Sequence, residues 1–270
     1  MKKLLFIFIM LGYGVTAIAQ EKFTLADELR GSITPQRAWW DLQHYSIEVD
    51  VFAQTKSLSG TNTITYTVLS PNSTMQIDLQ KPMKMDLVTQ NGKKVAVQRN
   101  GSAHFLKLPE PQIVGSQNKL VIHFSGAPTV ALNAPWDGGL VWSKDSNGID
   151  FIASANQGIG ASVWWPVKDH PQDEPDKGVD LFITTPKNLV GVGNGRLIEE
   201  ITNKDTKTWH WQVVNPINSY GVNINVGDYV TFSETYNGLK GKLDLSYWVL
   251  RDNLEIAKEQ LKQAPLMLEA

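Results

Sequence analysis

Four acidic side chains gather in one short, proline-rich stretch, and carboxylates are among the residues that bind metal ions. They are Asp169, Asp173, Glu174 and Asp176. Calcium takes oxygen ligands, so a calcium loop is one interpretation, but the spacing does not follow an EF-hand. The neighbouring prolines indicate a rigid surface loop whose carboxylates accept hydrogen bonds from turns. We favour this second role, and we expect His170, beside them, to be solvated rather than a metal ligand.

The five histidines lack the spacing of a hydrolytic zinc site. Such a site commonly uses two histidines one helical turn apart and a glutamate that activates water, in the pattern H-E-x-x-H. No histidine here precedes a glutamate, and no two are four positions apart: His44, His104, His123, His170 and His210. The G-x-S-x-G nucleophile motif is absent, and without cysteine there is no thiol chemistry. The sequence therefore predicts neither catalytic residues nor a metal site in this chain.

Gln157 is the side chain that we select as a candidate for substrate binding. It begins the stretch Gln157–Gly195, which contains a Trp pair, the acidic loop, an apolar run and a final Asn-Gly. A neutral amide can accept a hydrogen bond from an ammonium group and donate one to a carbonyl. The alternative is a glutamine that caps a loop, and the residue alone does not decide between the two. Asn156 is a weaker candidate beside it.

The same stretch resembles the N-terminal β domain of the aminopeptidase N family of zinc metallopeptidases, in the gluzincin clan. That family carries Q…G…WxPxxDxP, then an apolar strand, then P…L…V…NG. The matching residues are Gln157, Gly160, Trp165, Pro166, Asp169, Pro171, Pro186, Leu189, Val192, Asn194 and Gly195. The runs DGGLVW and HYSIEVDV, the latter followed by SLSGTNTITYTV, are also similar to the family. The resemblance spans residues 39–270.

This resemblance implies a role in removing N-terminal residues from peptides. In the family, the glutamine in this register projects into the cleft and helps to bind the N-terminal residue of the substrate. Neither H-E-x-x-H nor the family's G-x-M-x-N motif occurs here. The resemblance therefore implies that zinc, the cofactor of the complete enzyme, is held by a catalytic domain that is missing or is a separate chain. We expect this chain to be inactive alone and to expose an apolar interface.

Alternating apolar and polar residues predict strands through most of the chain. In Gln43–Phe52 the side chains of Tyr45, Ile47, Val49 and Val51 share one face. Asn91-Gly92 predicts a type I′ hairpin turn within residues 85–98. Turn signals about every ten residues predict an all-β fold, a large saddle-shaped multi-stranded sheet or sandwich, over residues 39–250.

The two ends of the chain have a different character. Residues 251–270 change to the helical period, which predicts a short C-terminal helix, capped by Asn253 and interrupted or ended at Pro265, at the start of a truncated catalytic domain. Residues 20–38 are predicted to be an N-terminal arm or linker with a helical turn around 25–29. Residues 1–19 have the basic start, apolar run and Ala17-Ile18-Ala19 site of a secretory signal peptide.

The apolar run of this signal is shorter than the ~20 residues that span a bilayer. We therefore expect cleavage before Gln20, no membrane anchor, and a periplasmic or secreted protein. Removing Lys2 and Lys3 from the 25 basic side chains leaves 23 against 27 acidic ones, a net charge of -4. There is no basic stripe to suggest a nucleic-acid partner. With 42% hydrophobic residues and no cysteine, the chain must rely on a packed core rather than disulfides.

Two further patterns have alternative interpretations. Trp136, Trp142, Trp164 and Trp165 suit either a sugar-binding platform or, as we favour, core and interface positions. Gly191, Gly193 and Gly195 resemble a nucleotide-binding loop only weakly, and their β context argues against one.

Two functions remain open from the sequence. The first is the cleft-framing domain of a secreted zinc aminopeptidase, whose partners are the catalytic domain and peptides. The second is a stand-alone periplasmic binding or scaffold module derived from that domain, with the Trp-rich loop 135–165 as its ligand face.

Overall fold

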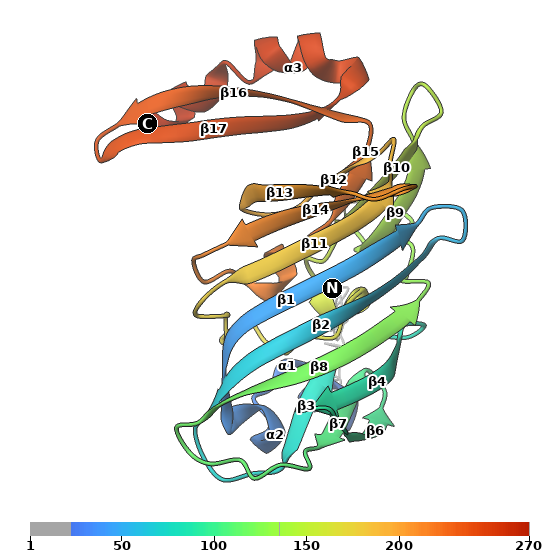
Figure 1. The fold of residues 1–270 in the computed structure, drawn as a ribbon, viewed down its shortest axis with the longest axis vertical. Coiled ribbons are helices and arrows are strands. Elements are labelled where there is room, and N and C mark those ends of the chain that lie inside the picture. Colours follow the sequence, from blue (N-terminus) through green and yellow to red (C-terminus); the bar gives the residue numbers. More distant parts are fainter. Residues whose placement is uncertain (1–22, 135, 270) are drawn as a thin grey trace, which may run out of the picture.

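A twisted eight-stranded sheet forms the centre of the computed structural model, which describes residues 23–134 and 136–269 (Figure 1). The predicted signal peptide, residues 1–19, lies outside the described residues. Only β1 and β11 run parallel, and the other neighbours are antiparallel. The strands lie in the order β13 (Arg196–Thr202), β14 (Thr206–Val213), β11 (Val179–Pro186), β1 (Trp40–Phe52), β2 (Ser57–Val68), β8 (Gln117–Gly126), β4 (Lys84–Gln90) and β5 (Lys93–Lys94).

Two smaller sheets accompany the large one. The four-stranded sheet has the order β12 (Val190–Val192), β15 (Asn225–Gly227), β10 (Asp150–Ala155) and β9 (Gly139–Lys144). The three-stranded sheet has the order β3 (Thr74–Asp78), β7 (Ala103–Lys107) and β6 (Ala96–Asn100). The predicted all-β fold is confirmed. None of the helices within the described ranges is both long and apolar enough to cross a membrane.

β1 shows how alternation makes a sheet with one buried face. Tyr45 and Ile47 are fully buried, whereas Glu48 and Asp50 on the opposite face are exposed. The buried face packs against the loop that follows β10, where the ring centroids of Tyr45 and Trp165 are 4.8 Å apart in an edge-to-face contact. Trp164 and Trp165 are both fully buried, so the core role that we favoured for them is correct.

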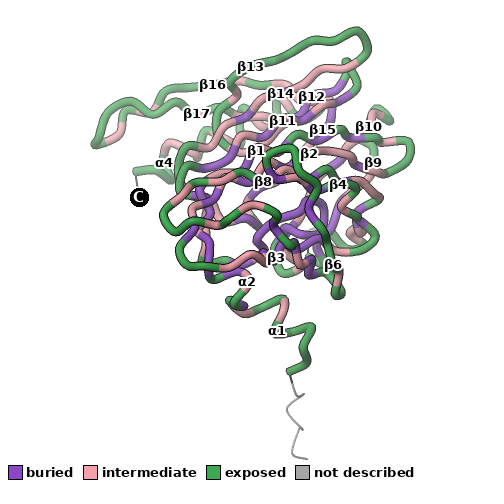
Figure 2. Tube along the Cα trace, turned by 60° about the horizontal axis from the view of Figure 1, so that its bottom comes forward, coloured by how far each residue is buried: buried purple, intermediate pink, exposed green. Residues whose placement is uncertain are grey.

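The hairpin and helical segments that were predicted around this core are present, with one difference. Asn91 and Gly92 both have positive φ, as a type I′ turn requires. In the arm, α1 (Leu25–Gly31) covers the expected helical turn and is followed by α2 (Pro35–Ala38), which was not predicted. Buried positions concentrate in the strands of the sheets, and exposed ones in α1 and the C-terminal hairpin (Figure 2).

The C-terminal part forms a separate two-stranded sheet followed by two short helices. The elements are β16 (Tyr229–Gly238), β17 (Gly241–Leu250), η3 (Arg251–Asn253), α3 (Leu254–Gln260) and α4 (Gln263–Glu269). We expected one helix that is interrupted or ended at Pro265, and this is wrong in detail. α3 ends at Gln260, and Pro265 lies in the first turn of α4. There the N–H that proline lacks would have no helical partner. Asn253 is the residue before α3, but its side chain makes no capping hydrogen bond.

His104 on β7 predicts a pH dependence of stability. Its ring is buried, and Nδ1–H donates to the carbonyl oxygen of Ser102 over 3.0 Å. Burial, together with the nearby charge of Arg99, lowers the pKa of His104 from 6.5 to about 4. The folded state therefore holds the neutral ring, whose stabilising contribution is complete above pH 6.5 and is lost as the pH falls towards 4.

We expect the free energy of unfolding to fall between pH 6.5 and pH 4, by an amount on the order of 1–3 kcal/mol for this group. Urea unfolding across that pH range measures it. In the variant His104→Gln this part of the slope should disappear, and an unchanged slope would contradict the assignment.

Candidate functional site

Gln157 and Asn156 lie in the loop between β10 and η1 (Ala161–Val163), with opposite exposures. The side chain of Gln157 is exposed. Asn156 is 3% exposed, and its Nδ2 donates to the carbonyl oxygen of Val222 over 2.6 Å. The Asn156 carbonyl accepts a hydrogen bond from the N–H of Gly160 over 2.8 Å, which closes a tight turn around Gln157. Asn156 thus anchors the turn that presents Gln157, and substrate binding stays a prediction for both.

Two side chains from distant parts of the chain hold the next carbonyl groups of this loop. Arg30 Nη2 donates to the carbonyl oxygen of Gly158 over 2.7 Å and to that of Ile159 over 3.1 Å. Gln80 Nε2 also donates to the Ile159 carbonyl, over 2.7 Å. The backbone on both sides of Gln157 is therefore fixed by hydrogen bonds.

Gly160 and Asp169 explain part of the motif that singled out this stretch. Gly160 has φ +93°, and a Cβ there would lie 2.4 Å from Asp169 Oδ2. The Asp169 carboxylate fills this space and accepts hydrogen bonds from the N–H groups of Ala161 (3.3 Å) and Ser162 (3.1 Å). It also accepts one from Ser162 Oγ over 2.5 Å. A side chain at position 160 would strain the backbone and displace the carboxylate.

Two of the other acidic residues of the loop, Asp173 and Asp176, have structural partners as well. Asp173 is paired with Lys168 Nζ, and Asp176 accepts from Gln43 Nε2 over 3.0 Å. Across residues 23–134 and 136–269, no three His, Asp or Glu side chains are placed to hold a metal ion.

His170 was expected to be solvated, and this is wrong. Its exposed fraction is only 7%, because the loop folds inward where Lys168 is anchored.

Lys168 was not singled out from the sequence, although it ties this loop to β1. Its ammonium group donates to the carbonyl oxygen of Trp40 over 2.8 Å and lies 3.9 Å from the centre of the Trp40 ring. Burial lowers the pKa of Lys168, and the charge of Asp173 opposes that shift. The run WWPV that precedes Lys168 does not indicate from the sequence that this lysine is buried.

The N-terminal arm contains a second buried ion pair that the sequence did not reveal. Arg37 on α2 is fully buried, and its Nη2 lies 2.5 Å from Asp78 Oδ2. Asp78 also accepts from Gln76 Nε2 (2.9 Å) and from the N–H of Asp169 (3.2 Å). Burial raises the pKa of Asp78 to about 6 although Arg37 acts to lower it. Residues 35–38 are therefore part of the folded body rather than a free linker.

Two of the histidines meet on the outer face of the large sheet. His44 Nε2 is 3.1 Å from one oxygen of Asp180, and His210 Nε2 is 2.8 Å from the other. Burial lowers the pKa of His44, while Asp180 opposes the shift. Both rings contact the Asp180 carboxylate through Nε2. These contacts link the adjacent strands β1, β11 and β14.

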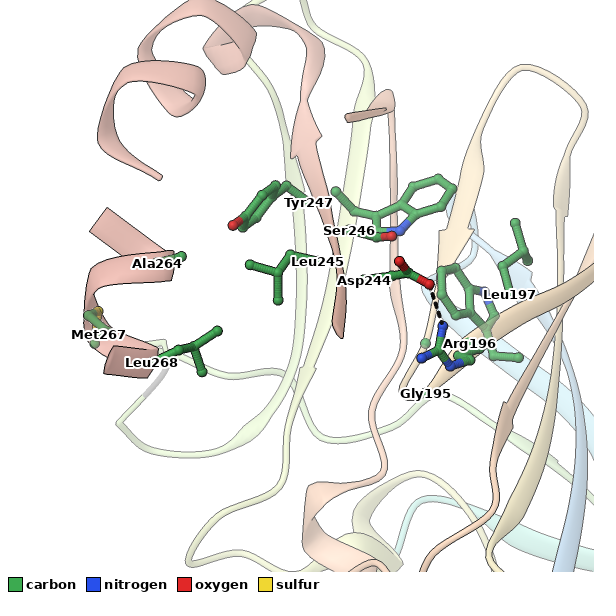
Figure 3. Close-up of a pocket in the computed structure, with 13 residues that line it drawn as sticks. Gly195, Arg196, Leu197, Asp244, Leu245, Ser246, Tyr247, Ala264, Met267 and Leu268 are labelled. Carbon is green, nitrogen blue, oxygen red and sulfur yellow. Dashed lines mark ion pairs between the residues drawn. The ribbon is translucent and has the colours of Figure 1, made fainter. Parts of the chain in front are cut away.

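An open apolar depression of about 860 Å³ lies where the C-terminal elements meet the edge of the large sheet (Figure 3). Trp211 of β14 and Trp248 of β17 both line it, with ring centroids 5.3 Å apart. Arg196 and Asp244 cross its edge as an ion pair of 3.8 Å. Other lining residues come from β17 and α4: Leu245, Tyr247, Ala264, Met267 and Leu268. Met267 is 72% and Leu268 48% exposed, so the α4 side of this apolar surface is open to solvent.

The fold and the loop motif together define the N-terminal β domain of an M1 peptidase. The sequence model of the Peptidase M1 N-terminal domain matches residues 42–220, and the chain belongs to this family. The match begins after the arm and ends before the β16–β17 hairpin. The resemblance to zinc aminopeptidases that the sequence suggested is thereby confirmed at the level of the family.

Solved structures support the same fold assignment. The M1 zinc metallopeptidase from Deinococcus radiodurans has a TM-score of 0.68 and 20% identity, covering 79% of this chain and 48% of that one. A mutant of that enzyme bound to a Tyr-Ser-Ala substrate has a TM-score of 0.68 and 21% identity, covering 80% and 49%. This chain thus spans about half the length of these structures. A search of curated proteins gave no match.

Proposed function

We propose that this chain is the N-terminal, cleft-framing domain of a secreted zinc aminopeptidase and is inactive alone. The observation that carries the proposal is the family match over residues 42–220, combined with similar zinc metallopeptidases of which the chain covers only about half. Secretion rests on the signal pattern in residues 1–19. In the complete enzyme, the exposed amide of Gln157 would accept a hydrogen bond from the substrate's ammonium group.

The side chains in residues 23–134 and 136–269 do not fit a zinc site. His44 and His210 use their Nε2 atoms on Asp180, and the buried His104 ring is bonded to Ser102. We therefore place zinc in the catalytic domain, where it would supply an activated water. What this chain would contribute is substrate orientation through Gln157 and a rigid wall for the cleft.

The apolar depression beside α4 is where we place the contact with the catalytic domain. Its occupant would be the catalytic domain, because residues of α4 line the depression and one of them, Met267, is 72% exposed. The isolated hairpin β16–β17 supports this placement, since two strands alone are marginally stable and usually gain further strands or a packed face. Trp211 and Trp248 would then lie at the domain interface.

A stand-alone binding module is the second candidate, and one residue favours it. Trp136 is 88% exposed, as expected for an aromatic ring that contacts a ligand. Trp164 and Trp165 belong to the core, so they are removed from the ligand face that this alternative needs.

An aminopeptidase assay of the purified chain from Gln20 onward tests the main proposal. We expect no release of amino acids from aminoacyl substrates with or without added zinc, because no zinc ligand set is present in residues 23–134 and 136–269. The native polypeptide from producing cells is the positive control. Zinc-dependent turnover by the purified chain that is lost in the variant Gln157→Ala would contradict the proposal.

A further inference from the structure

The N-terminal arm lies against the loop that presents Gln157, although it is outside the segment that the family model matches. Phe23, Asp27 and Arg30 from the arm line one depression of about 440 Å³ together with Asn156, Gly158 and Gly160 from the loop. The contact joins residues that are 128 positions apart in the chain. The arm is therefore placed to influence the conformation of this loop.

Arg30 makes this contact through two successive carbonyl groups. One guanidinium nitrogen donates to both Gly158 and Ile159, at 2.7 and 3.1 Å. These are the two residues that follow Gln157. A guanidinium group is always charged and presents several N–H donors in a fixed geometry, which suits two neighbouring acceptors. The contact thus fixes the direction of the backbone immediately after Gln157.

The backbone of Arg30 is itself held by buried side chains. Gln76 Nε2 donates to the carbonyl oxygen of Leu29 over 2.9 Å, and Arg37 Nη1 donates to that of Ser32 over 2.8 Å. Gln76 and Arg37 are fully buried and both bind Asp78. The arm is therefore anchored to the core on both sides of Arg30. A capping box of Thr24 and Asp27 fixes the beginning of α1.

We propose that Arg30 is a positioning residue for Gln157, so that the N-terminal arm is part of the substrate-binding apparatus of the complete enzyme. Arg30 acts through the loop backbone and does not itself touch substrate. The proposal has two parts. The first part, that the arm orders the loop, concerns this chain alone. The second part, that the arm affects substrate binding, rests on the proposed function.

The first measurement uses the chain from Gln20 onward. It follows hydrogen exchange in the peptide that covers residues 156–163. The N–H of Gly160, bonded to the Asn156 carbonyl, reports on closure of the turn. Arg30→Met should raise its exchange rate by about tenfold, the effect of losing two modest hydrogen bonds. Arg30→Lys should give an intermediate rate, because a single ammonium group replaces the fork. Lys107→Met, at an exposed position on β7, is the matched control and should leave the rate unchanged.

The second measurement uses the complete native enzyme with an aminoacyl substrate. Arg30→Met should raise KM by about three- to tenfold with little change in kcat. In the background Gln157→Ala, the same substitution should have no further effect, because the positioned side chain is gone. Lys107→Met should again be neutral.

The outcomes separate the two proposals. Unchanged exchange in Arg30→Met overturns the positioning role, whatever the enzyme does. Faster exchange with an unchanged KM, or a KM effect that persists in Gln157→Ala, also overturns it while leaving the proposed function intact. A native polypeptide without aminopeptidase activity overturns the proposed function and the effect of Arg30 on substrate binding, whereas the exchange measurement alone decides whether the arm orders the loop.

Discussion

Replacing Arg37 with Met lowers the free energy of unfolding of this chain by about 3–5 kcal/mol at pH 8, because it leaves a buried carboxylate without its cation. Arg37 is fully buried and pairs with Asp78, which is only 4% exposed. The Asp78 carboxylate keeps two hydrogen bonds in this variant, from the side-chain amide of Gln76 and from the backbone N–H of Asp169, and both donors are neutral. Urea unfolding of the variant beside the parent measures the change.

The double variant Arg37→Met, Asp78→Leu is the matched control. It removes both charges and should recover much of the lost stability, since an apolar pair avoids the desolvation of two ions. The loss in the single variant should also be smaller at pH 5. Burial already raises the pKa of Asp78, and losing Arg37 raises it further, so the carboxyl takes up a proton there. A loss under about 1 kcal/mol at pH 8 would contradict a buried, ionised pair.

The variant Gln157→Ala should reduce kcat/KM of the complete enzyme by roughly 10- to 100-fold. Gln157 is exposed within a turn that Asn156, Arg30 and Gln80 hold in place. A hydrogen bond from such an amide to a charged group contributes about 1.5–3 kcal/mol, and its loss converts to this range of rates. Steady-state kinetics with aminoacyl substrates measure it.

Two comparisons make this result specific. Gln98→Ala, at an exposed position on β6, should have no effect on kcat/KM. Gln157→Glu should retain part of the activity, because a carboxylate still attracts an ammonium group but cannot donate to a carbonyl. If Gln157→Ala matches the parent enzyme, the proposed role of Gln157 in substrate binding is wrong.

The elements that could be predicted from the sequence are those whose signal is local. The alternation of Tyr45 and Ile47 with polar neighbours identified β1 and its buried face. Asn91-Gly92 identified a hairpin because two consecutive residues with positive φ suit few sequences. The motif from Gln157 to Gly195 identified the loop and the family. Its Gly160 is a local requirement, because a Cβ at this position would collide with the Asp169 carboxylate.

The features that escaped prediction depend on contacts between distant segments. Arg37 is buried against Asp78, 41 positions away, and the Lys168 ammonium group reaches the carbonyl oxygen of Trp40, 128 positions away. No spacing in the sequence records either contact. His170 was expected in solvent for the same reason. The contact of Arg30 with the Gln157 loop joins the arm to a segment more than a hundred residues away. Burial of charged side chains is thus the property that the sequence concealed.

The mass of the native polypeptide that contains this domain tests the central claim most directly. An antibody against residues 23–269 would detect it in an extract of the producing cells, followed by intact-mass measurement. We predict a species well above 30.1 kDa, about one and a half times that mass, since the matched four fifths of this chain cover only about half of similar zinc metallopeptidases. A sole species of about 28 kDa, the 30.1 kDa chain without a signal peptide of roughly 2 kDa, would contradict it and favour a stand-alone module.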